Sequence, residues 1–219
     1  MSDLLYTSIL SEIESKIKEG ILSENDKLPS ERLLAENYDV SRTVVREALK
    51  ILQEKGLVKM ITGKGNFITI PKEKDLIDKF ETAIDNSSIS QNDIIEAREI
   101  IEIAISQRVI SRVVEEDIVE LKKIYEEMNN HFDNSEYFAK LDAEFHLQLA
   151  SCTRNNALKL ITSTLNNVTN RSNILNNIKM RKTSHKEHLA IIKAIEARDS
   201  SKLEEAIIQH IQCFRKHLQ

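Results

Sequence analysis

The chain has 219 residues, of which 41% are hydrophobic and 30% charged, and its formal net charge is −4. These values are typical of a soluble globular protein with one large or two small domains, and no apolar run predicts a membrane span. The N-terminus lacks a secretory signal pattern, and Cys152 and Cys213 form no disulfide framework, so a cytoplasmic protein with free thiols is expected. Only four Gly and two Pro favour a mainly α-helical fold.

The first domain, residues 1–71, is predicted to contain three helices followed by a β-hairpin. An apolar stripe over residues 6–17 predicts the first helix, and Ser30 and Ser41 stand at the N-cap positions of the next two. The segment 56–70 alternates apolar and polar residues around a Gly-Lys-Gly tip. This order is typical of a winged helix-turn-helix, whose third helix enters the DNA major groove.

A DNA-binding function requires local positive charge, because the whole chain is negative. Within residues 41–64, six Lys and Arg residues stand against two Glu residues, which is a local net charge of +4. The first two turns of the third helix carry polar and basic side chains that could bind bases or phosphates. These side chains are Ser41, Arg42, Thr43 and Arg46. A solvated helix face with ordinary charges is the alternative interpretation.

The segment LPSERLLAENYDVSRTVVREALKILQEKGLVKMITGKGNFI resembles the DNA-binding domain of GntR-family bacterial transcription regulators. The resemblance covers most of residues 6–70 and follows the family pattern LPSER-LA-VSRT-VREAL-L-GL-G-G-F at nearly every marked position. Position 44 is Val, where some members carry a polar contact residue, so the operator sequence stays open. The resemblance implies base or phosphate contacts by Arg32, Arg42 and Arg46, assistance by Ser41 and Thr43, and a wing tip formed by Gly63 and Lys64.

The second domain, residues 72–219, contains no Gly or Pro and is predicted to be an all-α antiparallel helical bundle. Apolar periodicity predicts helices at 73–85, 91–113, 115–130, 135–151, 155–178, 183–198 and 201–217. Three residue pairs have the spacing of a capping box: Ser90 with Asp93, Ser184 with Glu187, and Ser201 with Glu204.

Asp142 and His146 stand four residues apart in one predicted helix, so their side chains share a face. His188 and His210 lie on the apolar stripes of two other helices. One Asp and three His could together bind Zn²⁺, Ni²⁺, Mn²⁺ or Fe²⁺, although a single inward His is more often a hydrogen-bonded core residue. His185, one turn before His188, is also a candidate to support the ligands. The histidines without an inward context are expected at the surface: His131, His185 and His217.

Arg98 shares a helix face with Ile94, Ile101 and Ile105, so its guanidinium is expected inside the bundle. A buried Arg requires a carboxylate partner. One interpretation is an internal ion pair with Glu102, and the other is a clamp for an acidic effector whose other end binds the metal.

The segment 91–217 is similar to the all-helical FCD-type effector domain of the FadR subfamily of GntR regulators. The matching segments are NDIIEAREIIEIAISQ, LDAEFHLQLA, NNALKLI, EHLAIIKAIEARD and AIIQHI. One segment departs from the family pattern, because RNNAL stands where a Gly-Asn-Pro turn is common. The resemblance favours a carboxylate effector, such as an organic or sugar acid. It also implies a divalent metal site, with Zn²⁺ as the first expectation, at Asp142, His146, His188 and His210.

These patterns together predict a ligand-responsive transcription regulator that binds a palindromic operator as a homodimer, with no membrane partner. The effector would shift the relative placement of the two DNA-binding units. A regulator that senses the metal itself is an alternative. A metalloenzyme is a further alternative, but the chain has no HExxH motif, and only Glu144 or Glu187 could act as a general base.

Overall fold

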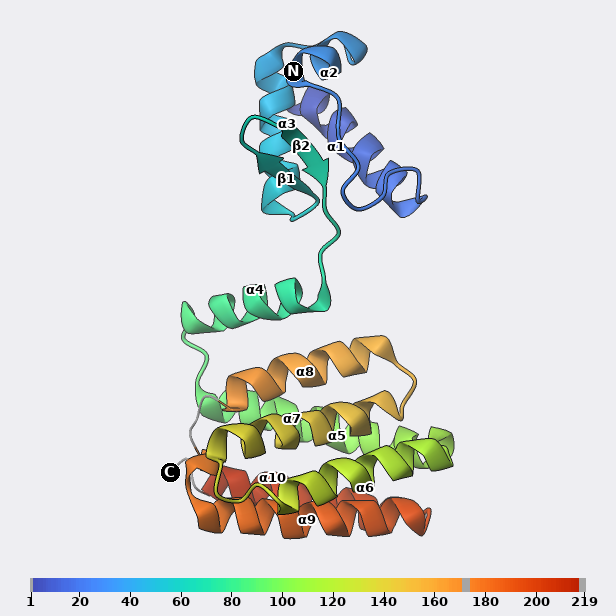
Figure 1. Ribbon diagram of the computed structural model, residues 1–219, viewed down its shortest axis with the longest axis vertical. Coiled ribbons are helices and arrows are strands. Elements are labelled where there is room, and N and C mark those ends of the chain that lie inside the picture. The colour runs from blue at the N-terminus through green and yellow to red at the C-terminus, as the bar shows by residue number, and fades with distance from the viewer. Residues whose placement is uncertain (1, 171–173, 217–219) are drawn as a thin grey trace. The chain divides into compact units, whose positions relative to one another are not determined.

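The computed structural model describes residues 2–170 and 174–216, and its fold is mainly α-helical with one two-stranded β-hairpin, as predicted (Figure 1). The chain divides into two compact units, Met1–Leu76 and Ile77–Gln219, which we call unit 1 and unit 2. The boundary falls inside helix α4 (Glu73–Asp85). None of the described helices combines the length and hydrophobicity that a membrane span requires.

Unit 1 is built from three helices and a hairpin. Ser30 and Ser41 are the predicted N-caps, because each hydroxyl oxygen accepts a hydrogen bond from the third backbone N–H after it. Ile9, Leu52 and Ile68 are fully buried and join the helices and the hairpin in one core. The elements are α1 (Ser2–Lys18), α2 (Glu31–Asn37), α3 (Arg42–Glu54), β1 (Val58–Ile61) and β2 (Gly65–Ile68).

The hairpin has the antiparallel register Val58 with Ile68 through Ile61 with Gly65. Gly63 at its tip has a φ of 75°, a conformation that glycine adopts without strain. The tip is exposed and carries Lys64 between Gly63 and Gly65, so the predicted hairpin with a basic tip is present.

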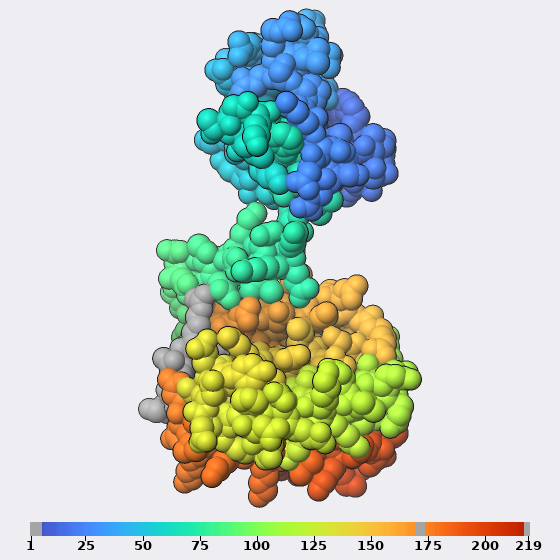
Figure 2. All heavy atoms as spheres, viewed as in Figure 1, coloured from blue at the N-terminus to red at the C-terminus, as the bar shows by residue number. Residues whose placement is uncertain are grey.

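Unit 2 is a helical bundle. Among the described residues, six helices form a closed ring in the order α5, α8, α7, α6, α9 and α10, with α10 packed against α5 (Figure 1). In the space-filling view, α6, α7 and α8 make up much of the visible face of this unit (Figure 2). The interior is filled by apolar side chains such as Ile105, Phe138 and Ile191. The elements are α5 (Gln91–Arg112), α6 (Glu115–Asn129), α7 (Ser135–Ser151), α8 (Asn156–Asn170), a 3-10 turn (Ile174–Asn176), α9 (Ile178–Glu196) and α10 (Ser200–Lys216).

The predicted helix at 155–178 is wrong in its second half. Helix α8 ends at Asn170, and α9 begins at Ile178 instead of residue 183. Asn177 caps α9 by accepting a hydrogen bond from the Lys179 amide. The buried Arg181 side chain donates to three carbonyl groups around the intervening turn, including that of Phe132 on a distant segment. Because a tertiary contact stabilises this turn, local periodicity could not reveal it.

The predicted helix starts at Ser90, Ser184 and Ser201 have different outcomes. Ser90 forms the expected capping box with Asp93 at the start of α5. Ser184 lies inside α9 and caps nothing. Helix α10 begins at Ser200, and Asp199 accepts a hydrogen bond from the Lys202 amide, so Asp199 takes the role predicted for Ser201.

Candidate functional site

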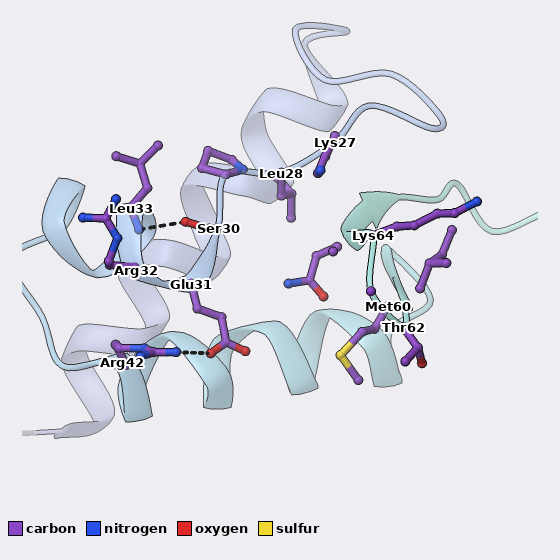
Figure 3. A pocket seen from close by; sticks show the side chains of 15 residues that line it. Lys27, Leu28, Ser30, Glu31, Arg32, Leu33, Arg42, Met60, Thr62 and Lys64 are labelled. Carbon is purple, nitrogen blue, oxygen red and sulfur yellow. Dashed lines mark hydrogen bonds and ion pairs between the residues drawn. The ribbon is translucent and has the colours of Figure 1, made fainter.

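An open groove of about 940 Å³ lies in unit 1 between the N-terminal ends of α2 and α3 on one side and the hairpin on the other (Figure 3). The arginine and lysine side chains along it are exposed. The groove is therefore bordered by positive charge from both sides, which suits a phosphate backbone. The predicted DNA contacts that line it are Arg32, Arg42, Gly63 and Lys64.

Glu31 connects the two arginines of α3. Its Oε2 accepts a hydrogen bond from Arg46 Nε at 2.8 Å and lies 3.6 Å from Arg42 Nη2 (Figure 3 shows the second pair). Both arginine side chains remain about 60% exposed, so Glu31 orients them without covering them. Sequence reasoning missed this residue, although it is the Glu of the LPSER motif.

Three predicted contacts do not line the groove. Arg46 lies one turn after Arg42 and is linked to the groove only through Glu31. Ser41 has its hydroxyl oxygen engaged as the N-cap of α3. Thr43 is exposed in the first turn of α3.

In unit 2 the four predicted metal ligands converge inside the ring. They come from three helices, with Asp142 and His146 on α7, His188 on α9 and His210 on α10. One donor atom from each lies within 4.8 Å of the others, and all four residues are at most 1% exposed. The Nε2 atom of His146 lies 3.0 Å from Nε2 of His210 and 3.4 Å from Nε2 of His188.

Nearby carboxylates determine which nitrogen atoms face this centre. Nδ1 of His210 lies within hydrogen-bond distance of Glu187 Oε2, at 2.9 Å. Nδ1 of His146 is also 2.9 Å from Glu102 Oε2, although this pair is not aligned as a hydrogen bond. A carboxylate beside Nδ1 favours the tautomer with the proton on that nitrogen, which directs the Nε2 lone pairs of His146 and His210 inward. Lone pairs only 3.0 Å apart repel each other, so the donor set fits a shared cation.

Two of the three histidines, His210 and His188, carry no proton charge at neutral pH. Burial, followed by the charge of His146, lowers the pKa of His210 to about 3. Burial and the two other histidines also hold the pKa of His188 well below its usual range. Both rings are therefore neutral and able to donate a lone pair. The Ser184 hydroxyl donates to Asp142 Oδ1 at 2.8 Å and orients that carboxylate.

Arg98, on α5, forms the internal ion pair that was one interpretation, and it keeps a nitrogen atom for the effector contact that was the other. Its Nε donates to Glu102 Oε1 at 2.5 Å, so the internal ion pair exists. Its Nη2 is buried without a hydrogen-bond partner among the described residues. Burial would raise the pKa of Glu102, but Arg98 and then His146 hold it well below its usual range. Glu102 thus stays ionised, and one guanidinium nitrogen remains for a ligand.

The surface position predicted for His185 is wrong. His185 is 8% exposed, and its ring stacks on Tyr125 with centroids 3.9 Å apart. Its Nε2 lies 3.1 Å from the Tyr125 carbonyl oxygen, so it does not join the four-residue cluster. His131 is half-buried, and His217 lies outside the described residues.

Two family models match the chain. The one described as "Bacterial regulatory proteins, gntR family" matches residues 5–68, and the one described as "FCD domain" matches residues 93–212. The Exu regulon transcriptional regulator of Escherichia coli (strain K12) is 30% identical over 95% of this chain and 82% of its own. The HTH-type transcriptional regulator LutR of Bacillus subtilis (strain 168) is 29% identical over 89% and 92%.

A solved structure described as "Streptococcus agalactiae GntR" has the same fold, with a TM-score of 0.71 and 24% identity over 97% of this chain and 100% of that one. The family model describes bacterial regulatory proteins and the relatives are named as transcription regulators, so this chain is a transcription regulator of the GntR/FCD type and not the metalloenzyme considered above. The matched segments correspond to the winged helix-turn-helix and the helical bundle. This chain belongs to the GntR family of bacterial transcription regulators, in the FadR-like subfamily that carries an FCD domain.

Proposed function

We propose that this regulator binds a palindromic operator as a homodimer. Its affinity for DNA would fall or rise when a small carboxylate binds beside a divalent metal in unit 2. Residues 1–71 would bind DNA, and residues 72–219 would bind the effector and dimerise. The observation that carries the proposal is the buried cluster of four convergent donors together with the free Nη2 of Arg98. A metal and a guanidinium are the two groups that bind a carboxylate most strongly.

Zn²⁺ is the first candidate for the metal, with Ni²⁺, Mn²⁺ and Fe²⁺ as alternatives. Three neutral imidazoles and one carboxylate are ligands that Zn²⁺ binds tetrahedrally or with one position open to a further ligand. Asp142, His146, His188 and His210 would hold it, and Glu102 and Glu187 would orient the rings. The bound metal would supply a positive charge at which an effector carboxylate can dock.

A second copy of the chain is needed for a palindromic operator, because two-fold symmetric half-sites require two DNA-reading helices. Unit 2 offers apolar surface for that contact. Ile100 on α5 is 62% exposed and Ile161 on the neighbouring α8 is 41% exposed. Exposed apolar side chains on adjacent helices are a feature of protein interfaces.

The direct test of the effector proposal is a thermal-shift screen of small carboxylates on the full-length, metal-loaded protein and on chelator-treated protein. An effector that binds through the metal stabilises only the loaded protein. A carboxylate that stabilises both forms equally contradicts metal docking. A response of operator binding to the metal alone, with no carboxylate effect, supports the metal-sensing alternative.

Arg98 is expected to be required for the effector response. Arg98→Gln alone leaves Glu102 as an unpaired buried charge, a change that costs about 3–5 kcal/mol and endangers folding. We therefore pair it with Glu102→Gln, which keeps two neutral hydrogen-bonding side chains. In a mobility-shift titration, the double variant should bind operator within about threefold of wild type. It should lose the effector response, because the guanidinium that would pair with the effector carboxylate is gone.

The matched control for the Arg98 experiment is Arg215→Gln. Arg215 lies on α10 and pairs with Glu99 of α5 at the surface. The same change there should leave unaltered the effector concentration that gives half of the response in operator binding. An unchanged midpoint in the Arg98 double variant would restrict Arg98 to a structural role.

Lys64 at the hairpin tip is expected to contribute charge without sequence specificity. Lys64→Ala should weaken binding to operator and to unrelated duplex by the same factor, because a phosphate contact carries no base information. The slope of log affinity against log salt should fall by about 1. Fluorescence anisotropy at several salt concentrations measures both quantities, and a selective loss of operator binding would instead assign Lys64 to a base contact.

A further inference from the structure

One carboxylate stands among the cations of the groove in unit 1. The charged residues that line this groove are four basic ones, Lys27, Arg32, Arg42 and Lys64, and one acidic one, Glu31, which gives the lining a net charge of +3. A surface that only had to attract phosphates gains nothing from a carboxylate, because the negative charge lowers the local potential. Glu31 therefore has a role other than attraction of the DNA backbone.

Glu31 lies between the two helices whose N-terminal ends border the groove. It is the first residue of α2, and Ser30 directly before it caps that helix. Its Oε2 atom lies 2.8 Å from Nε of Arg46 and 3.6 Å from Nη2 of Arg42, on successive turns of α3 (Figure 3 shows the pair with Arg42). The hydrogen bond to Arg46 uses Nε, so the two Nη nitrogen atoms of that arginine keep their donors for a base.

Stability does not account for this arrangement. The Glu31 side chain is 26% exposed and both arginine side chains are about 60% exposed, and ion pairs in such positions contribute little to folding. Among the described residues, Lys27 and Lys64 of the same groove have no carboxylate within ion-pair distance. A lysine acts as a point charge, but an arginine must present its planar fork to a guanine edge in one orientation. The shared carboxylate thus restrains side chains for which orientation matters.

We infer that Glu31 is a positioning residue that determines how strongly this regulator prefers its operator to unrelated DNA. It holds Arg42 and Arg46 in the orientation that base contacts need, so less conformational freedom is lost when the operator binds. Its negative charge also competes with phosphates for the same guanidinium groups, which weakens binding to unrelated DNA. Both effects raise the ratio of the two affinities. The inference rests on the proposed DNA-binding role of residues 1–71.

The test measures both affinities for Glu31→Gln, which keeps the size of the side chain and removes its charge. Full-length wild type and variant are titrated by fluorescence anisotropy with a duplex that wild type selects from a randomised library, and with a scrambled duplex of the same composition. We expect operator binding to weaken about threefold and binding to the scrambled duplex to tighten about threefold, so the specificity ratio falls about tenfold. For the scrambled duplex, the slope of log affinity against log salt should become steeper by up to about 1.

The matched control is Glu14→Gln. Glu14 of α1 pairs with Lys55 at the C-terminal cap of α3, so this variant removes the same charge from an ion pair with a residue outside the groove lining. Its specificity ratio should equal that of wild type. Partial unfolding would weaken binding to both duplexes together, so opposite changes on the two duplexes do not arise from a loss of structure. Circular dichroism and the melting temperature check the fold of each variant.

A double-mutant cycle shows whether Glu31 acts through an arginine. In the Arg46→Ala background, Glu31→Gln should reduce operator affinity less than it does in wild type, because a side chain that it positions is gone. The titrations are made at a salt concentration low enough for the weaker complexes to form. An equal loss in both backgrounds would mean that Glu31 contacts the DNA itself, for example a cytosine amino group, and would overturn the positioning role.

The outcomes separate this inference from the proposed function. An unchanged specificity ratio in Glu31→Gln would overturn the inference, whether both affinities rise, fall or stay the same. If replacing Arg42 and Arg46 abolishes operator binding while Glu31→Gln keeps the ratio, only the inference fails. If operator affinity survives the loss of both arginines, the proposed role of α3 in reading DNA fails together with the inference.

Discussion

Replacing Arg42 and Arg46 together by alanine should abolish specific operator binding. Both guanidinium groups are exposed at the start of α3, and Glu31 holds them in place. Each arginine that binds a guanine edge or a phosphate contributes about 1–3 kcal/mol, so the pair should cost at least about thirtyfold in affinity. The measurement is a mobility-shift titration with a duplex selected by the wild-type protein from a randomised library.

Two controls accompany this experiment, a separate charge variant and a check that the double arginine variant is folded. Lys55→Ala removes a positive charge from the other end of α3, where the side chain pairs with Glu14 of α1, and should change operator affinity little. The metal content and the helical circular dichroism of the double arginine variant should equal those of wild type. Operator affinity retained in a folded double variant would show that α3 does not read the DNA.

The purified protein is expected to carry close to one divalent metal per chain, and His188→Ala should remove it. This histidine is fully buried, and its Nε2 faces the other donors, so its loss removes one of the four ligands. A ligand present at a thousand times its dissociation constant adds about 4 kcal/mol to stability, so chelation should lower the melting temperature of wild type by several degrees. The variant should not respond to chelator.

Elemental analysis and thermal denaturation with and without chelator measure these effects. His185→Ala is the matched control, because it removes another buried histidine from α9 that stacks on Tyr125 outside the donor cluster. That variant should be less stable than wild type but should keep the metal. A full metal complement in His188→Ala, or none in wild type after addition of Zn²⁺, would rule out the proposed site.

Where the sequence carried a strong local signal, the structure agrees with it. The N-caps at Ser30, Ser41 and Ser90 are formed by short-range hydrogen bonds that depend on adjacent residues only. The apolar spacing of α7 placed Asp142 and His146 on the inward face before any partner helix was known. The residues that would hold a metal were therefore predictable one helix at a time.

The sequence failed where a distant contact decides the local structure. Arg181 organises the turn before α9 by reaching the carbonyl of Phe132, and Tyr125 buries His185 by stacking on it. No spacing rule connects these residues, since Phe132 lies in the connection between α6 and α7, Tyr125 lies on α6, and Arg181 and His185 lie on α9. The same applies to Glu31, whose role depends on where α3 packs against α2.

The sequence by itself predicted a winged helix-turn-helix followed by a helical bundle and pointed to four candidate ligands, because helix periodicity, caps and motif spacing are local properties. The class of protein followed from the resemblance of those motifs to the GntR family. Only the tertiary structure decided which polar groups are buried without partners. Whether Arg98, Thr162 and Asn166 are paired depends on every helix that surrounds them, and hydrogen bonding inside a bundle is a property of the packed ring and not of any one helix.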